Sequence, residues 1–180
     1  MSILEDKYNQ LCKTKSDINE HLPTLVKYTK DVNYITEFGV RKGVSTTAFL
    51  YAKPKKLVSY DITDRKFNHK FFRSIVDPCT NFVFIKGNTL KITIEETDLL
   101  FIDTYHTYSQ LSKELELHGN KAKKYIIFHD TNIYGEIGMD DKKPGLKKAI
   151  DEFLNINKHW FLKEEFENNN GLVVIKRRNS

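Results

Sequence analysis

Short apolar runs alternate with amphipathic segments along most of the chain. Five runs have the length and the β-branched or aromatic content of buried strands, and they cover residues 34–38, 56–61, 81–86, 98–103 and 125–129. Most of the segments between them carry apolar residues at helical spacing. Alternating strands and helices predict a mainly parallel α/β sheet, in which ligands bind at the carboxyl ends of the strands.

Both ends of the chain add elements to this core. Helical periodicity over 3–15 and 17–30 predicts an N-terminal helical cover that packs on the sheet. A helix over 145–156 precedes two runs, 159–167 and 171–178, that predict a closing β-hairpin. The predicted fold is therefore α/β: a Rossmann-like domain with a mostly parallel seven-stranded sheet and a C-terminal antiparallel hairpin.

Residues 133–144 contain two glycines and show no clear periodicity. They follow the last parallel strand, so we expect a mobile loop above the ligand-binding edge, in the position of a lid. The sequence shows no internal repeat and no second domain, and 180 residues are enough to bury a sizeable core. Residues 1–180 are therefore expected to form a single domain.

Composition and charge narrow the class of protein. No apolar run has the length of a membrane span and no export signal is visible, which predicts a cytoplasmic protein without a membrane partner. Cys12 and Cys79 lack metal-type spacing and are expected to be reduced thiols. The net charge of +5 is spread over several short basic clusters, so nucleic-acid binding is not indicated, whereas an anionic small molecule such as a sugar nucleotide would be attracted. The oligomeric state cannot be read from the sequence.

A glycine turn joins the first strand to the next helix. Gly39 and Gly43 follow strand 34–38, and Ser45 and Thr46 open the helix. Such a turn lets a ligand approach the backbone closely, and the helix N-terminus offers unpaired N–H groups. The spacing matches neither a dinucleotide fingerprint nor a phosphate-binding loop. Glu37, two residues before the first glycine, would repel a phosphate and suits an ammonium group, so we expect a positively charged ligand.

Polar residues also follow the second and third strands. Asp61 lies 22 residues after Gly39, the distance at which a carboxylate accepts ribose hydroxyls in nucleoside-binding α/β folds. Asp61 could instead cap the turn into the helix that begins near Arg65. Asn88 follows the third strand, either as a hydrogen-bonding partner of a ligand or as a simple turn residue.

The glycine turn resembles the first motif of the class I S-adenosylmethionine-dependent methyltransferases, most closely the branch that reads Glu-x-Gly-x-x-x-Gly-x-Ser-Thr. Arg41 stands where the commoner motif has a third glycine. Residues 101–108 and 128–131, Phe-Ile-Asp-Thr-Tyr-His-Thr-Tyr and Phe-His-Asp-Thr, are similar to signatures of a small-molecule O-methyltransferase branch that includes macrolide-sugar O-methyltransferases and cephalosporin-hydroxylase-like proteins. The resemblance covers about residues 22–178.

The resemblance implies a Rossmann-like methyltransferase domain that binds S-adenosylmethionine, with Asn88 beside the adenine in place of the usual acid. The residues expected to bind this cofactor are Glu37, Gly39, Val40, Gly43, Ser45, Thr46, Asp61, Ile62, Gly87, Asn88, Thr89 and Asp103. The implied reaction is methyl transfer to a hydroxyl of a small molecule, such as a sugar or glycoside.

Two consecutive central strands deliver acids and imidazoles to one edge of the sheet. Asp103 and Asp130, with His129, suit a hard divalent cation such as Mg²⁺, and in metal-dependent members of the resembled family these strand ends hold the ion. His129 could instead be a buried histidine bonded to backbone, and Asp103 could contact only the methionine end of the cofactor. We expect His106 to act as the base, with Asp103 as its catalytic partner, because methyl transfer to an alcohol requires removal of the hydroxyl proton.

Four further residues are candidates for the wall of the acceptor site, although aromatic packing would explain the tyrosines equally well. They are Tyr105, Tyr108, Asn132 and Tyr134. Two alternatives to a small-molecule methyltransferase stay open. One is an RNA methyltransferase that uses the basic clusters, and the other is a binding module whose site has degenerated at Arg41, Asn88 and His129.

Overall fold

The computed structural model describes residues 2–140 and 143–178. The strands of this part of the chain are β1 (Tyr34–Phe38), β2 (Lys56–Asp61), β3 (Asn81–Lys86), β4 (Thr97–Ile102), β5 (Ala122–His129), β6 (Trp160–Phe166) and β7 (Leu172–Arg177). They form a seven-stranded sheet in the order β3-β2-β1-β4-β5-β7-β6. Strands β1 to β5 are parallel, and β7 runs antiparallel to both β5 and β6. The predicted fold class is confirmed.

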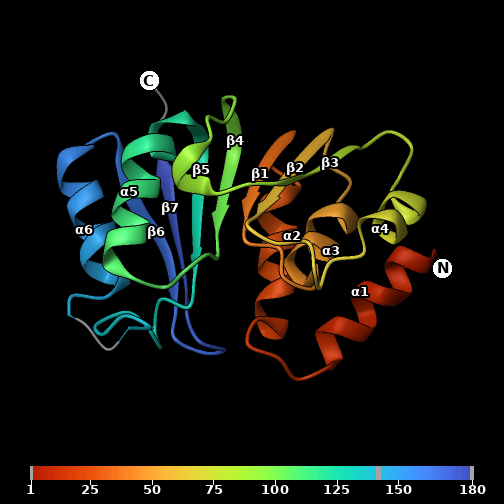
Figure 1. Ribbon diagram of the computed structural model, residues 1–180, viewed down its shortest axis with the longest axis horizontal. Helices are drawn as coiled ribbons and strands as arrows, with labels where there is room; N and C mark the ends of the chain where they lie inside the picture. Colours follow the sequence, from red (N-terminus) through yellow and green to blue (C-terminus); the bar gives the residue numbers. More distant parts are fainter. Residues whose placement is uncertain (1, 141–142, 179–180) are drawn as a thin grey trace.

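Helices cover both faces of the sheet (Figure 1). They are α1 (Ile3–Lys13), α2 (Leu22–Thr29), α3 (Val44–Tyr51), α4 (His69–Ile75), α5 (Tyr108–His118) and α6 (Leu146–Ile156), with the short 3-10 turns η1 (Asn19–His21), η2 (Thr89–Lys91) and η3 (Gly119–Lys121). Helices α1 to α4 lie on one face and α5 and α6 on the other. The second predicted helix, 17–30, is divided into η1 and α2, because Pro23 stands at the first positions of α2, where its missing N–H costs no helical hydrogen bond.

The pleat of the central strands divides the core into two clusters. Ile35 of β1 and Phe101 of β4 pack toward α1 to α4, together with Phe49 of α3. Phe38 of β1 points to the opposite face of the sheet from Ile35 and packs toward α5 and α6 with Phe153. Successive side chains of a strand point to opposite faces. This parity decides on which side of the sheet each polar residue at a strand end lies.

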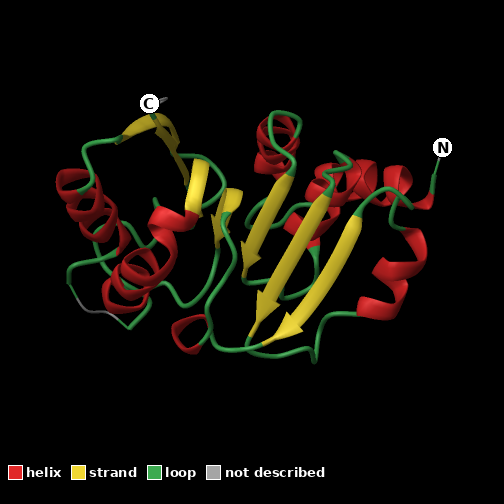
Figure 2. Ribbon diagram, turned by 90° about the horizontal axis from the view of Figure 1, so that it is seen from above, coloured by secondary structure: helices red, strands yellow, loops and turns green. Residues whose placement is uncertain are grey.

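The chain order reverses between β1 and β4. From β1 the chain continues to β2 and β3 on one side, whereas β4 and β5 lie on the other side. Neighbouring parallel strands end at the same edge of the sheet (Figure 2). The loops that leave β1 and β4 therefore diverge, which opens a crevice of the kind that binds ligands in α/β folds.

The predicted lid, 133–144, includes residues 141–142, which lie outside the described residues. Its described part is attached to the loop after β4, since the Met139 N–H donates to the carbonyl of His106 at 2.8 Å. Lid motion stays a prediction. Within 2–140 and 143–178, no helix is long and apolar enough to cross a membrane. Cys12 and Cys79 are free, as expected.

Substituting Gly39 by alanine should destabilise the fold strongly. Gly39 has φ +88°, and a Cβ there would lie 1.8 Å from the carbonyl oxygen of Asp103. We expect Gly39→Ala to lower the free energy of unfolding by about 3 kcal/mol or more, measured by urea denaturation. Gly87→Ala is the matched control, because its Cβ would meet only a side-chain methyl at 3.3 Å. Equal losses in the two variants would contradict this prediction.

Candidate active site

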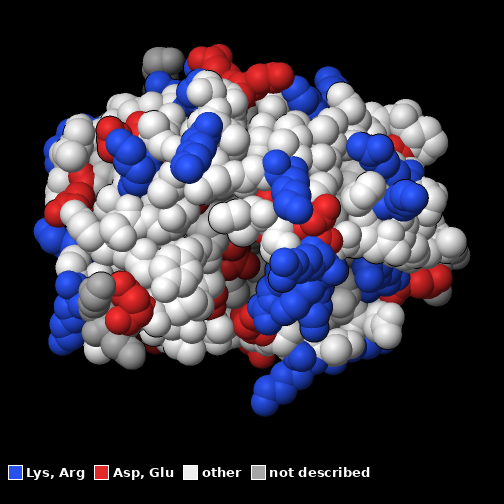
Figure 3. Space-filling model, in the orientation of Figure 1, with Lys and Arg blue, Asp and Glu red and all other residues white. Residues whose placement is uncertain are grey.

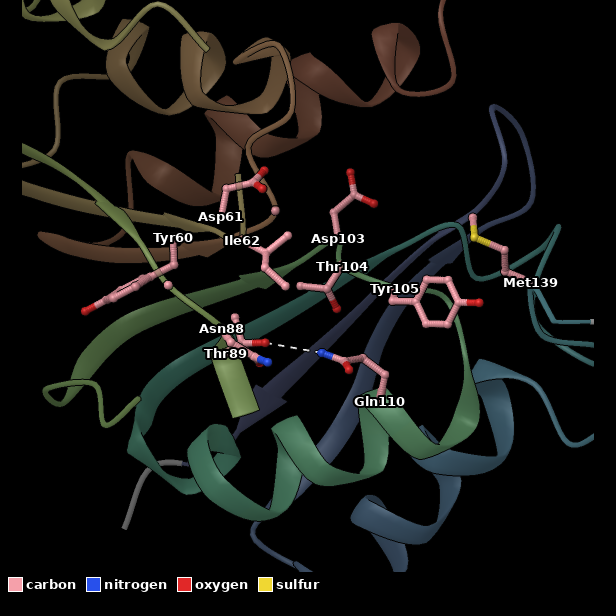
Figure 4. A pocket seen from close by; sticks show the side chains of 12 residues that line it. Tyr60, Asp61, Ile62, Asn88, Thr89, Asp103, Thr104, Tyr105, Gln110 and Met139 are labelled. Carbon is pink, nitrogen blue, oxygen red and sulfur yellow. Dashed lines mark hydrogen bonds between the residues drawn. The ribbon is translucent and has the colours of Figure 1, made fainter. Parts of the chain in front are cut away.

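A pocket of about 350 Å³ opens at the carboxyl ends of the parallel strands. Eight of the residues predicted from the sequence line it: Gly39, Asp61, Ile62, Gly87, Asn88, Thr89, Asp103 and Tyr105. Asp61 and Asp103 lie along one side of the pocket and Asn88, Thr89 and Gln110 along the other (Figure 4). On the outer surface, acidic atoms lie in a hollow that lysine and arginine side chains border (Figure 3).

Asp61 fixes the glycine loop. One of its carboxylate oxygens, Oδ2, accepts hydrogen bonds from the backbone N–H groups of Val40 and Arg41, both at 2.9 Å. The other oxygen accepts from the N–H of Thr63, also at 2.9 Å. The turn-capping role weighed for Asp61 is therefore present in the structure. Because Asp61 also lines the pocket, a contact with ribose stays a prediction.

Glu37 lies behind the pocket wall and does not line the pocket. Its side chain is 0% exposed and accepts hydrogen bonds from the hydroxyls of Ser45 at 2.6 Å, Ser59 at 2.5 Å and Thr46 at 2.9 Å. Burial raises the pKa of Glu37 to about 7, although the three hydroxyls favour the charged form. The contact with a ligand ammonium group stays a prediction, and Ser45 is the partner of Glu37 that reaches a pocket.

That second pocket is smaller and lies beside the glycine loop. It has a volume of about 100 Å³, and Val40, Arg41, Ser45 and Asp103 are among its lining residues. Asp103 lines both pockets, so the two are neighbours. Arg41 forms an ion pair with Asp17, at 2.6 Å between Nη1 and Oδ2. The departure from the resembled motif therefore places a guanidinium group at the edge of the smaller pocket.

Gly43 has a structural reason to be glycine. It is the N-cap of α3 with φ +78°, and a Cβ there would lie 2.6 Å from the ring of Phe72. The hydroxyl of Thr46, inside the same helix, is used by Glu37. The structure thus brings Gly43 and Thr46 to the glycine loop but not to the wall of either pocket, and their roles as cofactor ligands stay predictions.

A buried carboxylate that the sequence analysis missed supports the opposite wall. Glu114 of α5 is fully buried and accepts hydrogen bonds from Thr89 Oγ1 at 2.6 Å, Thr104 Oγ1 at 2.8 Å and Gln110 Nε2 at 2.9 Å. Burial raises the pKa of Glu114, against the effect of these donors. Gln110 also donates to Thr89 Oγ1 at 3.2 Å, so its amide nitrogen is used and its amide oxygen remains as an acceptor at the pocket.

The signal for this wall is present in the sequence. Gln110 and Glu114 are four residues apart and share a side of the helix, next to the apolar pair Leu111 and Leu115. A polar pair at helical spacing is typical of a solvent-facing side. The local pattern therefore could not separate it from a pair that faces a pocket.

Asn88 fulfils the turn role that was weighed for it. Its Oδ1 accepts from the N–H of Leu90 at 2.9 Å, which opens the turn η2. The side chain nevertheless lies at the pocket, where its Nδ2 is left as a donor. Ile62, which follows Asp61, is 68% exposed and lines the same pocket.

Two carboxylates and two imidazoles meet where β4 and β5 end. His106 Nε2 lies 3.0 Å from Asp103 Oδ1 and 2.8 Å from Asp130 Oδ2. His129 Nδ1 lies 3.5 Å and 3.6 Å from the same two oxygens. The predicted cluster is therefore present, and the side chain of Asp103, 25% exposed, connects it to both pockets.

The charges of this cluster stabilise one another. Burial alone would lower the pKa of both histidines. The neighbouring carboxylates have the larger effect, and they raise the pKa of His106 to about 9 and the pKa of His129 to about 10. Burial alone would raise the pKa values of Asp103 and Asp130, and the two neighbouring histidines outweigh it and lower both. Because both pKa values lie above 7, the two imidazoles carry the positive charge that balances the two carboxylates at neutral pH.

A divalent cation could be held by this cluster. One possible ligand atom from each of Asp103, His129 and Asp130 lies within 4.8 Å of the others. The two carboxylates suit Mg²⁺, whereas an imidazole nitrogen is a ligand that Mg²⁺ rarely takes. The alternative weighed for His129, a bond to backbone, is also present, because its Nε2 lies 3.1 Å from the carbonyl oxygen of Asp17.

The candidate acceptor residues are divided by the structure. Tyr105 is 54% exposed and lines the large pocket, and the ring of Tyr134 stacks on His106 with centroids 5.0 Å apart. Tyr108 instead donates its hydroxyl to Glu152 of α6 at 2.6 Å, and Asn132 donates to the carbonyl of Glu167 at 2.8 Å. A role of Tyr108 or Asn132 in acceptor binding stays a prediction.

The fold recurs among solved methyltransferase structures. A candidate caffeoyl-CoA O-methyltransferase from Staphylococcus aureus is 15% identical with a TM-score of 0.68, covering 98% of this chain and 93% of its own. A candidate O-methyltransferase from Klebsiella pneumoniae is 15% identical with a TM-score of 0.64, covering 99% and 91%. An O-methyltransferase from Bacillus cereus in complex with SAH is 14% identical with a TM-score of 0.63, covering 97% and 90%. No family model matches the sequence, and the comparison with curated proteins gives no match.

These structures confirm the Rossmann-like fold expected from the sequence resemblance. At identities of 14–15% the likeness shows the fold alone, and the chemistry of this chain has to be argued from its own residues.

The buried Glu37 should make stability depend on pH. Its pKa in the folded protein, about 7, lies above the ordinary value of 4.5, so its contribution is complete below the ordinary value and is lost as the pH rises through 7. The loss amounts to about 3 kcal/mol, using 1.36 kcal/mol per pKa unit. We expect the free energy of unfolding of Glu37→Gln, relative to the unchanged protein, to rise by about this amount between pH 4.5 and 8.

Urea denaturation at a series of pH values measures this difference. Glu167→Gln, the same change at an exposed residue, is the control and should follow the unchanged protein. A Glu37→Gln curve parallel to that of the unchanged protein would refute the prediction.

Proposed function

We propose that this chain is an S-adenosylmethionine-dependent methyltransferase that methylates a hydroxyl of a small molecule, such as a sugar or glycoside. The observation that carries the proposal is the position of Asp103, which joins the large pocket to the His106 and Asp130 cluster. A cofactor in the pocket would bring its reactive end to the group that can accept a proton. The shared fold, and the SAH held by the structure from Bacillus cereus, support this choice.

The large pocket suits the adenosine part of the cofactor. Gly39 would let the ligand approach the backbone, and Asp61, whose Oδ1 accepts one backbone N–H, would use its remaining lone pair for a ribose hydroxyl. Across the pocket, Asn88 Nδ2 is a donor and Gln110 Oε1 an acceptor, which complements the ring nitrogen and the amino group of adenine. Ile62 supplies an exposed apolar side chain against the base.

The smaller pocket suits the methionine part. Asp103 and Ser45 offer oxygen atoms to the ammonium group, and Arg41 offers a guanidinium to the carboxylate. Glu37 would act on the ammonium group through Ser45, because it contacts that hydroxyl and lines neither pocket. In this arrangement the predicted preference of Glu37 for a positively charged ligand would act through the hydrogen bond between Ser45 and Glu37.

The reaction needs a hydroxyl placed between the methyl group and His106. As the acceptor oxygen bonds to the methyl carbon, the sulfur–methyl bond breaks and its electron pair stays on sulfur, which becomes a neutral thioether. The hydroxyl proton passes to His106. The pKa of this histidine is raised to about 9, so the neutral imidazole that can accept a proton forms as the pH rises or when a bound cation offsets the carboxylate charge. The resulting imidazolium is stabilised by Asp103 and Asp130, which lie 3.0 and 2.8 Å from its Nε2. A divalent cation held by Asp103, His129 and Asp130 would supply Lewis-acid polarisation of the hydroxyl and would offset the carboxylate charge.

Calorimetric titration with S-adenosylmethionine and S-adenosylhomocysteine tests the proposal directly. We expect saturable binding of both, and methyl transfer to at least one hydroxyl compound in a panel of sugars, glycosides and phenols. His106→Gln should retain binding within about threefold and lose about 100-fold or more in transfer rate, because it removes the base and leaves the pocket unchanged. His159→Gln, at an exposed histidine, is the control. Failure to bind either compound would refute the proposal.

Gln110 should decide the preference for adenine. Leucine at this position cannot accept a hydrogen bond from the amino group of the base, whereas Glu114 keeps its bonds from Thr89 and Thr104. We expect Gln110→Leu to weaken binding of S-adenosylhomocysteine about tenfold and to leave binding of S-inosylhomocysteine, which lacks the amino group, nearly unchanged. Calorimetry on Gln10→Leu, the same change on α1, is the control. An undiminished preference for the adenosyl compound in Gln110→Leu would contradict this role.

A further inference from the structure

The hydrogen bonds of His129 leave one ring nitrogen for a cation. The residue is 1% exposed, and its Nε2 lies 3.1 Å from the carbonyl oxygen of Asp17. A carbonyl oxygen can only accept, so Nε2 carries the hydrogen and donates it. The other nitrogen, Nδ1, is buried and has no hydrogen-bond partner among the described residues. In metal-binding histidines one ring nitrogen commonly donates such a hydrogen bond to a backbone carbonyl, and the other ring nitrogen binds the metal.

The distances around Nδ1 suit two ligands of one ion better than a hydrogen bond. Nδ1 lies 3.5 Å from Asp103 Oδ1 and 3.6 Å from Asp130 Oδ2, beyond the usual N–H···O range of about 2.7–3.2 Å. Two ligand atoms each about 2.1 Å from a shared ion, at a tetrahedral angle, are separated by about 3.4 Å. A nitrogen lone pair that faces two carboxylates is repelled by them, so a cation, either a proton on Nδ1 or a metal ion, belongs at this position.

The carboxylates have outer contacts that orient them. Asn170 Nδ2 donates to Asp130 Oδ1 at 2.8 Å, which leaves Oδ2 on the side of His129 and His106. His106 Nε2 contacts that oxygen and Asp103 Oδ1, and each carboxylate oxygen has a second lone pair for an ion. Residues that orient ligands in this way are a regular part of metal sites.

We propose that Asp103, His129 and Asp130 form a site for a first-row transition-metal dication, such as Mn²⁺ or Zn²⁺, in preference to Mg²⁺. An imidazole nitrogen suits these ions, whereas Mg²⁺ is held by oxygen ligands and water. The expectation of Mg²⁺ from the sequence is thereby replaced by an ion that the donor atoms favour. This inference deepens the proposed function and rests on it for the role of the ion, whereas binding of the ion can be measured without methyl transfer.

The test is calorimetric titration of the full chain, freed of metal by chelation and dialysis, with MnCl₂, ZnCl₂ and MgCl₂. We expect one site for Mn²⁺ and Zn²⁺, and affinities at least about tenfold higher than for Mg²⁺. His129→Asp should lower the affinity for Zn²⁺ about tenfold or more and raise that for Mg²⁺, because an oxygen replaces the nitrogen. His159→Asp, at an exposed histidine, should leave the order of affinities unchanged.

A second variant, Asp103→Asn, has nearly the same side-chain volume but lacks a charged ligand. We expect it to lose Mn²⁺ binding, which is measured by the electron paramagnetic resonance signal of free Mn²⁺. No bound ion at about 1 mM, equal affinities for Mg²⁺ and Zn²⁺, or an unchanged order of affinities in His129→Asp would overturn the inference. Binding of S-adenosylhomocysteine is measured on the same samples. If that compound binds and no metal does, the inference alone fails; if metal binds and the compound does not, the proposed function fails.

Discussion

The end of β1 is held between its two neighbours, and the site depends on this contact. The N–H of Gly39 donates to the carbonyl of Tyr60, and the N–H of Asp103 donates to the carbonyl of Phe38, both at 2.9 Å. These bonds extend the ladders of β1 with β2 and β4 by one residue beyond the strands. They place Asp61, the last residue of β2, and Asp103, which follows β4, on opposite sides of Gly39. Only a residue without a Cβ allows this approach, because a Cβ at Gly39 would overlap the carbonyl of Asp103.

Around this contact, the protein holds buried and half-buried carboxylates and surrounds each of them with donors. Glu37 receives three hydroxyls, Glu114 two hydroxyls and an amide, and Asp61 three backbone N–H groups. Desolvation raises the pKa of Glu37 and Glu114 because hydroxyl and amide donors compensate for it only in part. Asp103 and Asp130 have imidazole partners instead, and their pKa values fall. Glu37 and Glu114, which have hydroxyl and amide partners, support the walls of the site. Asp103 and Asp130, which have imidazole partners, are the carboxylates that can take part in its chemistry.

The sequence was sufficient for the fold and for the strand ends, since both follow from periodicity. Parallel strands share an edge, so Asp61, Asp103 and Asp130 could be placed together without coordinates. The direction in which the Glu37 side chain points could not be predicted. Successive side chains of a strand point to opposite faces, so a shift of the strand by one residue would turn this side chain from α3 toward the other face. Gln110 and Glu114 were missed because a polar pair on a helix has the same local pattern whether water or a pocket faces it. The segment 17–30 was predicted as one helix, whereas Pro23, which stands at the first positions of α2, separates α2 from η1.

The N-terminal helical cover contacts the residues of the site as well as packing on the sheet. The segment between α1 and η1 supplies the Asp17 carbonyl that fixes the ring of His129, and the carboxylate of the same residue pairs with Arg41 of the glycine loop. His21 of η1 packs edge-on against His129, with centroids 5.9 Å apart, and is itself bonded to the carbonyl of Asn168. A single residue of the cover, Asp17, thus contacts both Arg41 of the glycine loop and His129 of the strand-end cluster. The smaller pocket and the cluster of Asp103, His129 and Asp130 therefore share one short stretch of backbone as a support.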